Sequence, residues 1–120
     1  MAITREEIDK LLSNSQSDGK PLSLEGTDLT RINLDGLDLS GANLRGAVLA
    51  GASLREAILS EADLREADLQ DADLEEADLS DALLTDAEVA GASFRGANLV
   101  GAEVEDVNFA EANLEDVRFL

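Results

Sequence analysis

The sequence of 120 residues has no cysteine, histidine, tryptophan or tyrosine, and only three phenylalanines. Without cysteine, neither disulfides nor thiolate metal sites can form. Without histidine or cysteine, the usual triads and dyads of nucleophilic catalysis cannot be built. Because aromatic side chains usually form much of an ordinary globular core, this chain must fill its interior with other residues.

Basic residues and long apolar runs are also scarce. Nine Lys and Arg face 27 Asp and Glu, for a net charge of −18, so direct nucleic-acid binding is not expected. No run of about 18 apolar residues is present, so no membrane span is expected. The start of the chain, Met1–Glu7, is charged where a signal peptide is apolar, and we expect a cytoplasmic protein. A hydrophobic content of 44% argues against disorder.

A period of five residues runs from Leu22 to the end of the sequence. Every fifth residue from Leu24 to Phe119 is Leu, Val or Phe, and the residue two places earlier is Ala at every repeat from Ala42 to Ala102. This period fits neither a straight helix, around which the apolar residues would scatter, nor a flat strand, on which they would change face at each repeat. It favours a short extended piece and a turn in each unit, with stacked units burying one continuous core.

The tandem Ala-Asn/Asp-Leu-X-X units resemble the pentapeptide-repeat family over residues 22–120. The resemblance implies an all-β fold, a right-handed quadrilateral parallel β-helix with twenty residues per coil and therefore five coils. Family members abound in bacteria, especially cyanobacteria. We expect the core to contain the central residues Leu44, Leu64, Leu84, Phe94 and Phe109 and the small residues Ala42, Ala62 and Ala82.

The charges support the twenty-residue coil independently. In such a coil, residues twenty apart are neighbours about 4.8 Å apart. The position after the central residue then alternates in sign, reading Asp35, Arg55, Glu75, Arg95 and Glu115. Exposed pairs of this kind contribute about 0.2–1 kcal/mol each.

The last position of each unit divides the chain into glycine units and acidic units. Glycine permits the positive φ that the third residue of a type II turn requires, whereas glutamate is strained there. We therefore predict type II turns at the glycine units and a different turn from Glu56 to Asp86.

The first 21 residues do not share the repeat, and we divide the chain into a helical cap with its connector, 1–21, and a β-helix, 22–120. Thr4 and Glu7 have the spacing of a capping box, and Ile8, Leu11 and Leu12 form an apolar helical stripe. A solenoid needs a cover at its end, because an open coil exposes unpaired backbone and core side chains. A helix that recruits a partner is the alternative.

No catalytic residue, cofactor site or metal site is expected, because the repeat places the carboxylates on the outside of a rod. The leading hypothesis is a noncatalytic scaffold or protein-interaction module. The alternative is an acidic DNA mimic that binds DNA gyrase or another topoisomerase, as some similar proteins do. Residues 22–120 hold 23 acids and six arginines, about 0.7 charge per Å against about 0.6 for duplex DNA. All four walls are acidic, which favours solubility as the simpler role of the charge.

Exposed apolar residues are the best markers of a binding surface. We select Ile58, Val100, Phe119 and Leu120 as the candidate interaction surface for an unknown protein partner. The last coil, with Phe109 and Phe119 at its end, is also a candidate surface for a homodimer.

Overall fold

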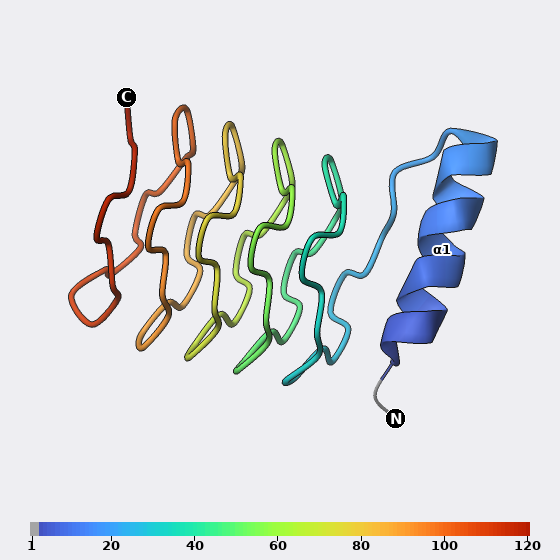
Figure 1. Cartoon of the computed structure of the whole chain (residues 1–120), viewed down its shortest axis with the longest axis horizontal. Coiled ribbons are helices and arrows are strands. Elements are labelled where there is room, and N and C mark those ends of the chain that lie inside the picture. The colour runs from blue at the N-terminus through green and yellow to red at the C-terminus, as the bar shows by residue number, and fades with distance from the viewer. Residues whose placement is uncertain (1–2) are drawn as a thin grey trace.

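The computed structural model describes residues 3–120 and contains one helix, α1 (Arg5–Asp18), followed by a stack of coils (Figure 1). Thr4 and Glu7 form a capping box at the start of α1. The Thr4 hydroxyl accepts the Glu7 N–H, and the Glu7 carboxylate accepts the Thr4 N–H, both over 3.1 Å. The helix ends at Gly19, whose φ of 72° lets its N–H reach the Ser15 carbonyl.

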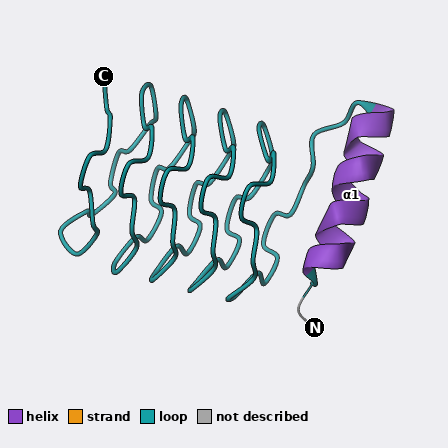
Figure 2. Cartoon of the chain, in the orientation of Figure 1, coloured by secondary structure: helices purple, strands orange, loops and turns teal. Residues whose placement is uncertain are grey.

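Residues 22–120 are held together by fifteen isolated parallel bridges, and each bridge joins residues twenty apart, from Ser23 with Asn43 to Asn98 with Arg118. Four turns fall within each twenty residues. The twenty-residue coil that the family resemblance implied and the charges supported is therefore confirmed. Between residues 3 and 120 the extended pieces are too short to count as strands, and the stack is drawn as loops (Figure 2).

Backbone hydrogen bonds run along the axis and join each coil to both neighbours. The Leu44 N–H donates to the Asp63 carbonyl at 2.7 Å, and the Asn43 N–H donates to the Leu22 carbonyl at 2.8 Å. The repeat thus satisfies the backbone between coils while the central and small side chains of each unit point inward.

The rod has four walls, which we number in chain order by their central residues. The first wall contains Leu24, Leu44, Leu64, Leu84 and Val104; the second contains Leu29, Leu49, Leu69, Val89 and Phe109; the third contains Leu34, Leu54, Leu74, Phe94 and Leu114; the fourth contains Leu39, Leu59, Leu79, Leu99 and Phe119.

With the exception of Glu111, the corners of the rod have the same backbone conformation in glycine units and in acidic units. The corner residue has φ of 66–78° at glycines and 58–64° at other residues, including Glu56 and Asp86. The predicted change of turn type from Glu56 to Asp86 is therefore wrong. The reason is the ladder: the N–H of a corner residue bonds the next coil, as from Glu66 to the Thr85 carbonyl at 3.0 Å, so tertiary pairing overrides the local preference.

Helix α1 lies across the first coil. Ile8 is completely buried, Ile3 and Leu12 pack against the core, and the Arg5 guanidinium donates to the Asn33 carbonyl at 3.1 Å. Leu11 is 37% exposed, so its predicted place in the packed stripe is wrong. Ile8 and Leu12 are about 40° apart around the helix and share the covered face, whereas Leu11 lies about 60° from Ile8 on the side away from Leu12.

The ladder opens at one place, on the second wall between the coils 82–101 and 102–120. Among residues 22–120, the bridge expected between Glu88 and Asn108 is the one missing from the regular series. The Gly91 N–H bonds the Glu111 carbonyl instead of that of Ala110, and Glu111 lacks the positive φ of the other corners. Figure 1 shows a wider loop at this point near the C-terminus.

Bulky residues alone do not explain the opening. Val107 and Phe109 flank Asn108, but Val117 and Phe119 flank Arg118 in the same way, and Arg118 keeps its bridge. What distinguishes Phe109 is that its ring packs edge-on against two others, Phe94 at 5.9 Å and Phe119 at 6.3 Å between centroids.

Candidate functional site

The interior of the rod is filled by apolar side chains and offers no site. The predicted core residues Leu44, Leu64, Leu84, Phe94, Ala42, Ala62 and Ala82 are all buried, whereas Phe109, near the C-terminal end, is half-buried. Within residues 3–120 no buried side chain is polar or charged. Any chemistry of this chain therefore lies on its walls, corners and ends.

The residue before each central position has a local role that the sequence reasoning did not assign. All eleven Asp and Asn residues at this position accept the backbone N–H two residues on, over 2.9–3.1 Å. This is the Asx turn, to which short carboxylates and amides are suited. The enrichment of Asp and Asn between the apolar pair was the signal that could have revealed it. Much of the acidity of the walls therefore serves to shape the coil.

The third wall carries the alternating charges predicted from the sequence. Arg55 lies 3.6 Å from the Glu75 carboxylate, and Arg95 lies 3.8 Å from both Glu75 and Glu115. Asp35 accepts the Arg55 backbone N–H at 2.9 Å. The arginine side chains are about half exposed, so these pairs are screened by salt and contribute little individually.

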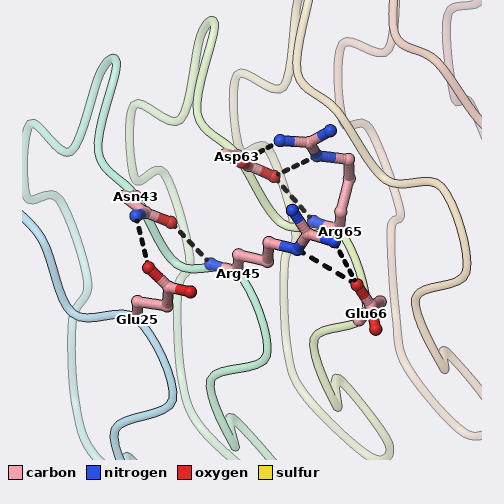
Figure 3. Close-up of polar contacts among 6 residues, drawn as sticks. All are labelled: Glu25, Asn43, Arg45, Asp63, Arg65 and Glu66. Atoms are coloured by element: carbon pink, nitrogen blue, oxygen red, sulfur yellow. Dashed lines mark hydrogen bonds and ion pairs between the residues drawn. The ribbon is translucent and has the colours of Figure 1, made fainter.

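The first wall carries the shortest ion pairs (Figure 3). Arg65 donates to both carboxylate oxygens of Asp63 at 2.7 and 2.9 Å, and Arg45 donates to Glu66 at 2.7 Å. The hydrogen bonds from Arg65 hold the pKa of Asp63 below its usual value. A hydroxyl does the same on other walls, where Thr30 lowers the pKa of Asp28 and Ser40 lowers that of Asp38.

The glycine corners of the coil 82–101 lie beside acidic side chains of the preceding coil. A Cβ added to Gly91 or Gly101 would lie 2.1 Å from a carboxylate oxygen of Asp71 or Asp81. These acidic side chains fold over the glycine corners of the next coil and occupy the space that a side chain would need.

The structure does not gather the predicted interaction residues into one patch. Ile58 is 39% exposed, and its bridge partners Asp38 and Asp78 separate it from other apolar residues of the fourth wall. Val100 is half-buried two coils away. Phe119 is 43% exposed and Leu120 fully exposed, so the apolar surface is concentrated at the C-terminal coil.

The described part of the chain has neither a cluster of metal ligands nor a membrane-spanning helix. Residues 3–120 hold no group of three or more carboxylates arranged to bind a metal ion. None of their helical segments has the length and apolar character needed to cross a bilayer.

A stack of twenty-residue coils with a Leu and Ala interior, Asx turns and charged walls defines a β-solenoid. The family model for pentapeptide repeats (8 copies) matches residues 23–49, 47–86 and 87–119. The chain belongs to the pentapeptide repeat family, whose members fold as right-handed quadrilateral β-helices. A search of curated proteins gave no match.

Solved structures of other members are similar to this chain. Rfr23 from the cyanobacterium Cyanothece 51142 is 38% identical over 78% of this chain and 60% of its own, with a TM-score of 0.62. A protein of the Arabidopsis thaliana thylakoid lumen is 33% identical over 82% of this chain and 66% of its own, with a TM-score of 0.61. A protein from Nostoc Pcc 7120 is 30% identical over 93% of this chain and 74% of its own, with a TM-score of 0.58. The chain thus spans less than two thirds of the length of the first two relatives.

Proposed function

We propose that this chain is a noncatalytic protein-interaction module, built as a rod of five coils and twenty repeats. The observation that carries the proposal is the division between a closed apolar interior and walls rich in ionised groups. In the described part of the rod, residues 3–120, no carboxylate enters the interior, whereas the walls are flat and rigid surfaces on which a partner can be bound without ordering flexible loops.

Capture by the immobilised chain tests this proposal when corner charges are reversed wall by wall. Glu56 and Glu76 follow the third wall, and Glu61 and Asp81 follow the fourth. Within residues 3–120 the side chains of these four make no hydrogen bond or ion pair, although their backbone N–H groups bond the next coil. The two double Lys variants therefore change the charge equally. We expect a specific partner to be lost with one variant and retained with the other. Equal loss with both, or a partner chemically altered by the chain, would contradict a specific binding module.

We also propose that two copies of the chain associate through the coil 102–120. Phe119 and Leu120 are the most exposed large apolar residues there, and Phe109 is half-buried beside them. Light scattering should give twice the chain mass, and Phe119→Glu should restore the single mass. Ile58→Glu, on the fourth wall, is the matched control and should leave the dimer intact. A native chain of single mass at tens of micromolar would refute the dimer.

A DNA mimic acting on DNA gyrase is the second candidate, and the charge density favours it. Carboxylates occur in every coil, at its corners, on its walls or at both, giving about 0.7 charge per Å along the axis against about 0.6 in duplex DNA. A supercoiling assay with purified gyrase distinguishes the two candidates. Inhibition that is lost on reversing the corner charges would support the mimic, and unchanged supercoiling at micromolar protein would exclude it.

A further inference from the structure

The opening in the ladder leaves four backbone groups of the second wall without their regular partners. In the regular series the Val89 N–H would donate to the Asn108 carbonyl, and the Asn108 N–H would donate to the Ala87 carbonyl. Neither bond is present among the backbone hydrogen bonds of residues 3–120. On the first and third walls the hydrogen bonds between the same two coils are intact: the Leu84 N–H donates to the Glu103 carbonyl at 2.8 Å, and the Phe94 N–H donates to the Asn113 carbonyl at 2.8 Å.

A groove of about 320 Å³ lies at this opening. Its apolar floor is made by Ala87, Val89 and Ala90, and its rim by Gln70, Asp86, Glu88, Asp106 and Asn108. The volume is near the lower limit for pockets that hold small ligands. Ala87 and Val89 are buried and Asn108 is exposed, and a buried N–H or C=O group is costly to leave unpaired. A ligand that supplies both a donor and an acceptor satisfies the Val89 N–H and the Ala87 carbonyl.

The carboxylates of the rim favour a positively charged ligand. Asp86, Glu88 and Asp106 carry no ion pair within the described chain, and Glu88 accepts one hydrogen bond, from the Gln70 amide at 2.9 Å. The wall positions of the second wall, on either side of each central residue, contain no Lys or Arg, in contrast to the first and third walls. Among residues 3–120, therefore, no basic side chain neutralises the rim.

We propose that this groove binds an arginine or lysine side chain carried by an extended segment of a partner protein. The cationic head lies between the rim carboxylates and donates to the Ala87 and Asn108 carbonyls. The backbone of the segment pairs with the free N–H groups of Val89 and Asn108, as in binding at the edge of a sheet. The inference rests on the proposed role as an interaction module and assigns the site and the chemistry of the partner.

Two end-blocked peptides test the site on the full chain at 0.15 M NaCl, where charges beyond about 8 Å are screened. One has the sequence Thr-Arg-Val-Arg-Thr, and its neutral counterpart replaces both Arg by Gln. With the first we expect amide chemical-shift changes centred on Val89 and Asn108. With the second we expect binding at least about tenfold weaker. Changes spread over all four walls, equal binding of both peptides, or no change with either would overturn the proposal.

Matched triple variants separate the groove from general acidity. Asp86→Asn, Glu88→Gln and Asp106→Asn together should weaken binding of the arginine peptide about tenfold or more. Glu61→Gln, Asp81→Asn and Asp116→Asn remove the same charge at other corners and should leave binding within about twofold. Equal loss in both triples would show a nonspecific electrostatic attraction.

Hydrogen exchange of the free chain tests the groove without a ligand. The amides of Val89 and Asn108 should exchange faster than those of Leu84 and Phe94, which keep their ladder bonds. Equal protection would mean that the ladder is closed and the groove absent. A loss of wall-specific capture together with intact peptide binding would contradict the broader interaction role but not this site.

Discussion

Single residues at the corners of the rod adopt a strained backbone conformation that the coil requires. Ten residues other than glycine take positive φ there, seven of them consecutive acidic corners from Glu56 to Asp86. A left-handed conformation costs a residue with a Cβ about 1–2 kcal/mol, and glycine avoids this cost. The strain persists because the next coil fixes the corner N–H.

Glu61 offers a test of that strain. Glu61→Gly should raise the free energy of unfolding by about 1 kcal/mol relative to Glu61→Ala, because both remove the carboxylate but only alanine keeps a Cβ at φ near 60°. Urea unfolding of the two variants measures the difference. Equal stability would show that the corners are unstrained.

The Asp63–Arg65 pair gives a pH dependence. The pKa of Asp63 is lowered in the folded chain, so its contribution is present above the unfolded pKa of about 3.9 and is lost as the pH falls through the lower folded pKa. Asp63→Asn should therefore lower the unfolding free energy by about 0.5–1 kcal/mol at pH 7 and by less at about pH 2. Urea midpoints at both pH values measure this.

Asp68→Asn is the matched control, because Asp68 has the same position in its repeat and bonds the Gln70 N–H without an arginine partner. Its effect should be small at either pH. A loss at pH 7 as large as that of Asp63→Asn would assign the effect to the turn instead of the ion pair.

At the scale of elements, α1 stabilises the stack by covering its first coil. Ile8 is completely buried, whereas Leu11, three residues on, is exposed. Ile8→Ala should lower the free energy of unfolding by about 2–4 kcal/mol, because it removes buried methylene groups and leaves a cavity. Leu11→Ala should change it by less than about 0.5 kcal/mol. Thermal unfolding followed by circular dichroism compares them, and equal losses would contradict the docking of α1.

The elements also show what the sequence could and could not predict. The five-residue period predicted a chain that turns a corner in each unit. The resemblance to the family implied the twenty-residue coil, and the alternation from Asp35 to Glu115 supported it. The turn type at Glu56 was wrong, since the ladder between coils outweighs a preference of one residue. The gap in the ladder between Glu88 and Asn108 could not be predicted, because the repeat continues through it. The three phenylalanine rings that meet edge-on beside the gap come together only in the folded structure.

For the whole molecule, the decisive quantity is the excess of 27 acids over nine bases. Coil stacking sets like charges side by side, as in the bridge between Asp68 and Glu88, while the arginines form a few exposed ion pairs. Salt weakens repulsion and ion pairs alike, so the sign of its effect reveals which is larger. The excess of acids predicts that repulsion is larger.

The free energy of unfolding should therefore rise by about 1 kcal/mol between 10 mM and 0.5 M NaCl. The double variant Glu61→Gln and Asp81→Asn, which neutralises two corners twenty residues apart, should show a smaller rise. Neutralising Glu6 of α1 and Asp116 removes the same charge at sites in different elements, and this control should retain more of the response. If the free energy of unfolding instead falls with salt, the ion pairs of the first and third walls outweigh the repulsion between carboxylates. The acidity of the rod then does not destabilise the fold, and a basic partner would have no repulsion to relieve.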